Sequence, residues 1–226
     1  MRYFTFENSI EPSVVGNDYP QAYKFIKGYE EKAPNALFSL YKYYDSFPDY
    51  EPNLDGIMLA GYAKLTDFVS SAFSGRIIIM SPKAREVFER YCLCPHRFYP
   101  LGLYKRKVKY DYFMFFIQPD CSDFVDYPKT TFLEYNEGVF PPRPIDIESK
   151  KDFIEKREKM YAKDGLSHTI RASEIAMDKT FNRDLDFFGV YWIGGTDYVS
   201  ERLKDEIEAN NLSGWIFEPV TNLIVE

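Results

Sequence analysis

Three aspartates, Asp120, Asp123 and Asp126, follow an apolar stretch at intervals of three residues. Closely spaced carboxylates in a loop could bind a cation or supply a general acid and a general base. The glycine at the sixth position and the acid at the twelfth that a calcium-binding loop requires are both missing from this sequence. We therefore expect a solvated acidic loop. A small hydrolase or transferase with an acidic site near Asp120–Asp126, assisted by His168, is the alternative function.

The segment from Cys92 to His96 places two cysteines and a histidine at alternate positions. Paired cysteine ligands of structural zinc sites are separated by about two to four residues, so that the loop can direct both sulfur atoms at one ion. One intervening residue is too few for that geometry. We interpret this segment as the end of a helix and predict no bound metal.

Other catalytic patterns are missing from the sequence. The two histidines, His96 and His168, lie in no recognisable nucleophile motif, and no phosphate-binding loop or zinc-protease motif occurs. Gly194 and Gly195 could bring the backbone close to an anion, but a tight approach to the following strand explains both glycines equally well. We predict no catalytic residue and no cofactor.

A segment rich in aromatic and acidic residues surrounds Pro48. Aromatic residues are enriched at protein interfaces, and surface acids attract basic partners. We predict that five residues of this segment contact a partner protein: Tyr44, Asp45, Asp49, Tyr50 and Glu51. In the alternative interpretation the aromatic rings fold back onto the core.

The chain has 226 residues and a formal net charge of −7, which argues against a nucleic-acid-binding protein because such proteins cluster lysine and arginine. The basic cluster at Lys105–Lys107 is better explained as a charged hairpin tip. No stretch approaches the roughly 18 apolar residues of a membrane span. Three cysteines, an odd number without an export signal, indicate reduced thiols and a cytoplasmic location.

The spacing of apolar residues predicts a single α+β domain over residues 1–226, with a mixed or antiparallel sheet. Strands are expected at 2–6, 23–26, 76–80, 97–104, 108–117, 130–135, 168–177 and 187–193. Helices are expected at 35–44, at 55–70, after Ser81, and at 150–163. The proline cluster at 140–144 is expected to form an extended crossover inside the domain.

Two segments of the chain match at an offset of 119 positions, the spacing from Ser81 to Ser200. Each reads as a strand, a helix capped by serine, a helix stop, and a strand ending in Phe-x-Pro. We predict a duplicated strand–helix–strand unit at about 76–104 and 190–224. Both copies of this unit lie in residues 74–226, the repeat-bearing part of the chain. Residues 1–73 are the less matched part, which carries no recognised motif.

The second copy carries a family resemblance in Phe188–Trp192, Tyr198–Lys204 and Leu212–Val220. These residues resemble the C-terminal part of the proteins in a bacterial family, immunity protein family eleven of polymorphic toxin systems. The family was first catalogued as a domain of unknown function. The resemblance extends to Ile77–Pro100 and more loosely to Tyr110–Leu133. It implies a cytoplasmic protein that binds and neutralises a cognate toxin encoded by an adjacent gene, and it carries over no catalytic residue. A phage or surface-assembly component is a third hypothesis.

Overall fold

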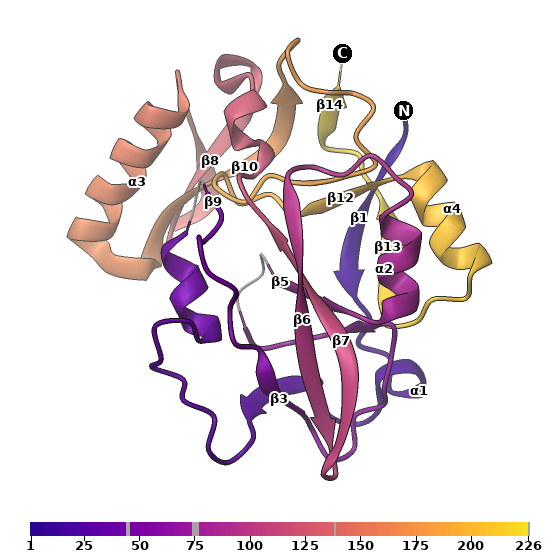
Figure 1. Cartoon of the computed structure of the whole chain (residues 1–226). Helices are drawn as coiled ribbons and strands as arrows, with labels where there is room; N and C mark the ends of the chain where they lie inside the picture. Colours follow the sequence, from indigo (N-terminus) through magenta and orange to yellow (C-terminus); the bar gives the residue numbers. More distant parts are fainter. Residues whose placement is uncertain (44–45, 74–76, 138, 226) are drawn as a thin grey trace.

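The computed structural model describes residues 1–43, 46–73, 77–137 and 139–225. Within these residues the strands form three sheets, mixed and antiparallel, and helices pack beside them, which confirms the α+β prediction (Figure 1). The first sheet has the order β11 (Phe187–Gly189), β12 (Asp197–Ser200), β1 (Tyr3–Asn8), β13 (Trp215–Pro219). The second has the order β2 (Ala22–Phe25), β3 (Asp55–Leu59), β6 (His96–Lys105), β7 (Val108–Ile117), β5 (Ile77–Met80), β4 (Phe68–Val69).

The third sheet has the order β14 (Leu223–Val225), β10 (His168–Met177), β8 (Thr131–Asn136), β9 (Val139–Ile145). The α-helices are α1 (Pro12–Val15), α2 (Pro82–Phe88), α3 (Lys150–Asp164) and α4 (Glu201–Ala209). Short 3-10 helices are η1 (Leu37–Lys42), η2 (Cys121–Phe124), η3 (Tyr127–Lys129) and η4 (Gly165–Ser167). Figure 1 shows α3 beside the third sheet, away from α2 and α4.

The predicted duplication is present in the fold. Ser81 and Ser200 each follow a strand and begin a helix, and their hydroxyls accept the N–H groups of Ala84 and Leu203 at 3.2 Å. This is the serine N-cap that the sequence predicts. In each unit an antiparallel strand separates the two strands that the helix connects: β7 lies between β5 and β6, and β1 lies between β12 and β13.

The two central strands are equivalent in register and sequence. The matching ladder positions are Phe4 opposite Val199 and Pro219, and Phe113 opposite Met80 and Pro100. The stretch from Tyr3 reads Tyr-Phe-Thr-Phe, and the stretch from Tyr112 reads Tyr-Phe-Met-Phe. The N-terminal strand thus completes the second unit, whereas β7 directly follows β6 in the first. A search at one offset misses this match, because the central strands are 109 positions apart.

A cluster of phenylalanines joins the two units. Phe6 and Phe115 lie at the centres of their sheets, and both contact Phe88 and Phe187 with ring centroids 5.2 to 5.9 Å apart. Each of these side chains is buried. Burial of a large aromatic ring is among the strongest hydrophobic contributions in a core, so this cluster holds the two units together.

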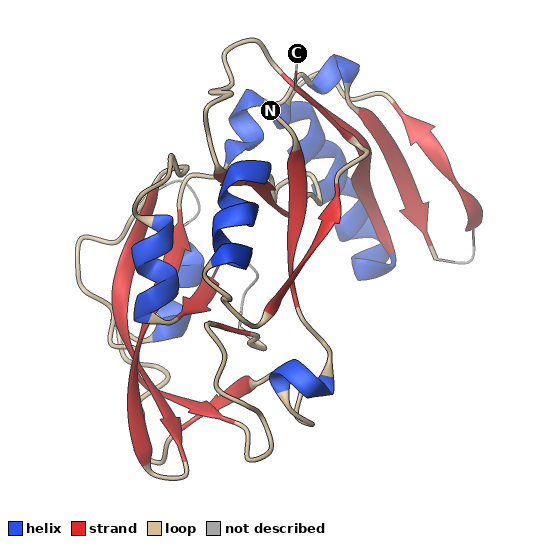
Figure 2. Cartoon of the chain, turned by 90° about the vertical axis from the view of Figure 1, so that its right-hand side faces the viewer, coloured by secondary structure: helices blue, strands red, loops and turns tan. Residues whose placement is uncertain are grey.

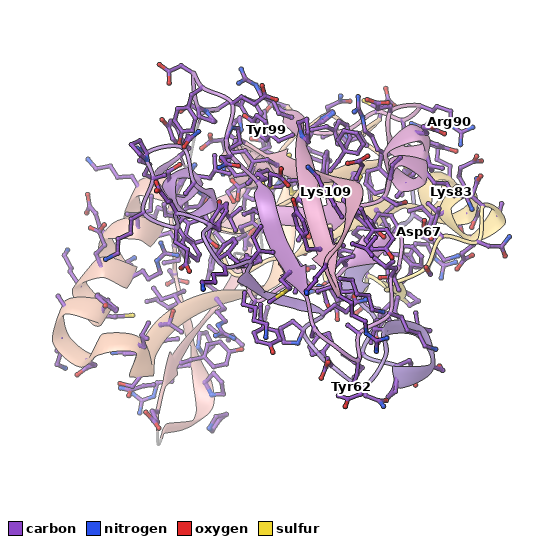
Figure 3. The ribbon with its side chains drawn as sticks, turned by 60° about the horizontal axis from the view of Figure 1, so that its bottom comes forward. Tyr62, Asp67, Lys83, Arg90, Tyr99 and Lys109 are labelled. Atoms are coloured by element: carbon purple, nitrogen blue, oxygen red, sulfur yellow. The ribbon has the colours of Figure 1, made fainter. Side chains whose placement is uncertain are left out.

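The helices of the two units lie side by side (Figures 1 and 2). Lys83 on α2 donates to the carbonyl of Asn210, just after α4, at 2.6 Å. Arg90, which follows α2, forms an ion pair with Glu206 on α4 at 2.6 Å. Figure 3 shows Lys83 and Arg90 on the side of the molecule that α4 occupies.

A second hydrophobic core covers the other face of the six-stranded sheet. Leu37, Leu40 and Leu54, from the chain before β4, pack with Tyr99 and Met114 of the central hairpin. The less matched part of the chain therefore supplies a cover for this sheet.

Some predicted elements are wrong. The helix expected at 55–70 is β3, a turn and β4, because these residues pair with distant strands and Gly56 disfavours a helix. The helix expected at 35–44 is only the short η1. The proline cluster is extended, as expected, but it lies in the edge strand β9, paired with β8, and not in a crossover; missing N–H groups are tolerated at a sheet edge. The strand expected at 187–193 ends at Gly189.

The hairpin between β6 and β7 turns through two residues in the left-handed region, Arg106 (φ 48°) and Lys107 (φ 72°). This geometry favours Asn-Gly, and an ordinary L-residue costs about 1 kcal/mol or more there. The double change Arg106→Asn with Lys107→Gly should raise the free energy of unfolding by about 1 to 2 kcal/mol, measured by urea denaturation. Lys107→Ala, which removes charge but keeps the unfavourable φ, should give no gain; an equal gain would contradict the explanation.

Candidate functional site

The acidic loop that the sequence singles out is divided among separate contacts. Asp120 is buried, contrary to the expectation of a solvated loop, and its carboxylate accepts the backbone N–H of Tyr191 at 2.7 Å and of Trp192 at 3.2 Å. It also accepts the N–H of Ser122 at the start of η2. Asp120 thus satisfies buried backbone donors of two loops, which is a structural role.

The other two acids of this loop form surface ion pairs. Asp123 binds Lys150 at 2.8 Å, and Asp126 binds Lys129 at 3.0 Å. Within the described parts of the chain, no group of three or more His, Cys, Asp or Glu residues is placed to hold a metal ion.

His168 lies at the start of β10, between two carboxylates. Its Nε2 lies 2.6 Å from Glu134 and its Nδ1 2.8 Å from Asp164. The hydrogen bond to Asp164 raises the pKa of His168 most, and the hydrogen bond to Glu134 raises it further. Since both ring nitrogens are engaged with these carboxylates, His168 is held as a link between α3, β8 and β10.

The raised pKa of His168 predicts a pH-dependent contribution to stability. The folded protein binds the proton more tightly than the unfolded chain, so the stabilisation is fully present below the ordinary histidine value and is lost as pH rises through the folded pKa. The wild type should have a higher free energy of unfolding than His168→Gln. This difference should be about 1 kcal/mol larger at pH 6 than at pH 9. Urea denaturation at both pH values measures this, and a pH-independent difference would contradict it.

The cysteine–histidine segment lies in the loop between α2, which ends at Phe88, and the start of β6, so it follows the helix end that the sequence predicts there. Cys92 is exposed, whereas Cys94 is buried, and burial raises the pKa of the Cys94 thiol well above its usual value. Nδ1 of His96 lies 2.8 Å from the carbonyl oxygen of Cys94, and the ring packs against Phe98. These side chains do not share one coordination centre.

The glycine pair after β11 also has a packing explanation. A Cβ at Gly195 would collide with the carbonyl oxygen of Val190, and Gly194 has a φ of 82°. A larger residue at either position would meet a backbone atom or an unfavourable φ. The close approach to the Val190 carbonyl explains Gly195, and the positive φ explains Gly194.

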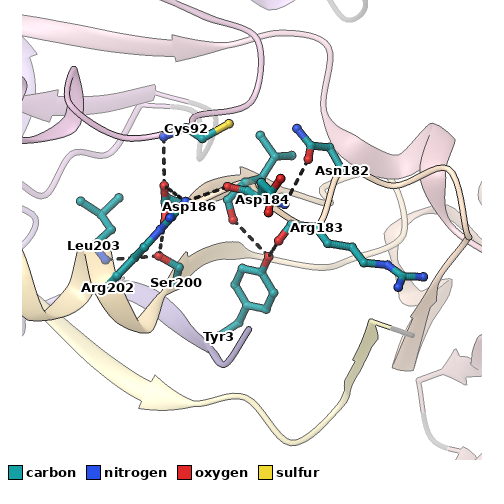
Figure 4. Close-up of polar contacts among 10 residues, drawn as sticks. Tyr3, Cys92, Asn182, Arg183, Asp184, Asp186, Ser200, Arg202 and Leu203 are labelled. Atoms are coloured by element: carbon teal, nitrogen blue, oxygen red, sulfur yellow. Dashed lines mark hydrogen bonds and ion pairs between the residues drawn. The ribbon is translucent and has the colours of Figure 1, made fainter.

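Asp186 is the centre of a buried polar network at the repeat junction (Figure 4). Its carboxylate accepts the Ser200 hydroxyl at 2.5 Å and forms two hydrogen bonds with the Arg202 guanidinium. It also accepts the N–H of Cys92 at 2.9 Å, from the loop after α2 of the other unit. One carboxylate therefore fixes the cap of its own helix and the neighbouring loop.

Asp67 plays the equivalent part in the first unit (Figure 3). Its carboxylate accepts the Ser81 hydroxyl at 2.8 Å, and the N–H of Ser213, in the loop after α4, at 2.9 Å. The two units are thus linked reciprocally. Sequence reasoning missed these aspartates, although Asp67-Phe68 and Asp186-Phe187 share the 119-residue offset.

The predicted partner-binding segment is described from Ser46 onward; Tyr44 and Asp45 lie outside the described residues. Asp49 and Glu51 are exposed, whereas Tyr50 is half-buried, with its hydroxyl 2.5 Å from the Ser39 hydroxyl. The two acids therefore face solvent from a segment that Tyr50 attaches to η1.

Arg97 on β6 attaches the same segment to the six-stranded sheet. Its guanidinium lies 4.7 Å from the centroid of the Phe47 ring and donates to the carbonyl of Pro48 at 2.9 Å. Phe47 in turn packs against Phe116. The ring of Phe47 folds onto the core, as the alternative interpretation holds, while Asp49 and Glu51 stay accessible.

Among the described residues, no helix is both long enough and apolar enough to cross a bilayer. The chain matches no family model, and no curated protein is significantly similar to it in sequence.

Proposed function

We propose that this chain is an immunity protein that binds a cognate bacterial toxin and neutralises it by covering part of the toxin surface. The resemblance of the second repeat unit to immunity protein family eleven supports this function. The structural observation that supports it best is the segment 46–51, in which Asp49 and Glu51 are exposed on an anchored backbone.

An anchored segment suits recognition because little conformational freedom is lost on binding. Contacts of Arg97 with Phe47 and Pro48, and of Tyr50 with Ser39, hold the segment before a partner arrives. The two carboxylates and the net charge of −7 favour a toxin with a basic surface.

The alternative hydrolase or transferase receives less support. Asp120, Asp123 and Asp126 bind three different sets of partners, and His168 is engaged by Glu134 and Asp164. A hydrolytic site needs its acid and base groups to converge on one substrate position.

Co-expression tests the proposal. Wild-type protein should rescue cells from a toxin encoded next to its gene, and Asp49→Lys with Glu51→Lys should weaken toxin binding by about tenfold or more. The matched control reverses two exposed acids on the helices, Glu86→Lys with Asp205→Lys, and should retain rescue.

Failure of the wild type against every adjacent toxin would refute the immunity function. Equal loss in both double variants would show that net charge, and not the segment 46–51, determines binding.

A further inference from the structure

A cavity of about 400 Å³ opens where the two repeat units meet. Its walls come from β1, β12 and β13 of the first sheet and from the β4–β5 edge of the second. Phe6, Trp215, Val69, Ile77 and Ile78 are among the residues that line it. Binding cavities for small molecules have volumes of roughly 300 to 1,000 Å³.

The charged residues among the described ones that line the cavity are Glu7 and Asp197, and both are acids. Glu7 is exposed, whereas Asp197 is only 6% exposed. Carboxylates in a low-dielectric hollow favour a positively charged ligand, because fields are concentrated there.

The repeat scaffold does not require an acid at position 197. The equivalent residue of the first unit is Ile78, which also lines the cavity. Burial raises the pKa of Asp197 to about 7, and the Tyr191 hydroxyl donates to its carboxylate. A buried carboxyl group with a strongly shifted pKa at the wall of a cavity is a recognised mark of a functional site.

The aromatic walls suit an organic cation. Trp215 stacks on Phe6 with ring centroids 3.5 Å apart, and Tyr19 and Phe73 also line the cavity. Aromatic faces attract ammonium groups, and quaternary ammonium ligands are commonly held this way. The indole N–H of Trp215 and the side-chain oxygen of Asn8 are buried and have no hydrogen-bond partner among the described residues.

We propose that this cavity binds a small organic cation, an amine or quaternary ammonium compound with an apolar group, whose charge pairs with Asp197 and whose apolar part lies against Phe6 and Trp215. This site is separate from the segment 46–51, and it does not depend on the immunity function.

Benzyltrimethylammonium is a suitable probe because its charge is independent of pH. Binding is followed by the NMR signal of the Trp215 indole N–H, assigned with Trp192→Phe because the chain has two tryptophans. The cation should bind at least about tenfold more tightly than benzyl alcohol, its neutral counterpart, as expected for a desolvated charge pair. Affinity should rise between pH 6 and pH 8 as Asp197 ionises.

Asp197→Asn should remove both the preference for the cation and its pH dependence. Tyr191, Cys94 and Tyr198 are titratable groups that interact with Asp197, and Glu7 lines the same cavity. Glu7→Gln is therefore the matched control and should keep the pH profile.

Equal affinity for benzyl alcohol, or a flat pH profile in the wild type, would overturn the proposal. The wild-type profile provides this test even if Asp197→Asn fails to fold.

Discussion

Replacing Asp186 by alanine should destabilise the protein by about 2 to 4 kcal/mol, the range expected when a buried acceptor of several hydrogen bonds is removed and its donors are left unsatisfied. The variant leaves the hydroxyl of Ser200 and the N–H of Cys92 without their acceptor and removes the partner of Arg202. These hydrogen bonds lie in both repeat units, so a single cooperative transition should shift to lower urea concentration. Urea denaturation followed by circular dichroism measures the change.

Asp184→Ala is the matched control, because this exposed aspartate accepts its hydrogen bond from Arg202 through the backbone carbonyl, which the substitution keeps. It should change stability by less than about 0.5 kcal/mol. Asp67→Ala should fall between the two variants, since Asp67 has the equivalent hydrogen bonds but is half-buried. A loss of stability for Asp186→Ala no larger than that for Asp184→Ala would contradict the structural role of the network.

Replacing Asp197 by asparagine should stabilise the protein increasingly as pH rises. The pKa of Asp197 is about 7 in the folded protein and 3.8 in its reference state. Between these values the folded protein holds a proton that the unfolded chain releases, so the wild type loses stability as pH rises. The advantage of Asp197→Asn should grow from near zero at pH 4 to at most about 4 kcal/mol at pH 8.

Urea denaturation of both proteins at pH 4, 6 and 8 measures this difference. Paired carboxylates elsewhere, such as Asp152, have lowered pKa values, so their contribution to the free energy of unfolding increases as pH rises. They are common to both proteins, so their contribution cancels. A difference that does not change with pH would show that Asp197 does not titrate as described.

A stabilising change at Asp197 that abolishes cation binding would connect the two results. Functional residues are commonly retained at a cost in stability. Ile78, at the equivalent position of the first unit, already shows that the scaffold accepts an apolar side chain there.

Local patterns were sufficient for several elements. The serine caps at Ser81 and Ser200, the β6–β7 hairpin and the helix α3 match the expectations from spacing and capping residues. These features depend on interactions within about ten residues or on direct repetition, and a single sequence records both.

Long-range pairing could not be predicted in the same way. Residues 55–70 have helical spacing, but contacts with β6 and β5 make their ends into strands. The role of β1 depends on a strand pair at the opposite end of the chain. Whether the acids of the segment 46–51 contact a partner stays a prediction.

The sequence by itself determined the fold class, the duplicated unit and its helix caps, because these follow from periodicity and from short-range hydrogen bonds. Only the tertiary structure decided which carboxylates are buried and what they bind. Asp120 and Asp186 bind backbone and side-chain donors far away in the sequence, and Asp197 lies in a cavity. Burial and pKa depend on neighbours brought together by folding, which the order of residues does not show.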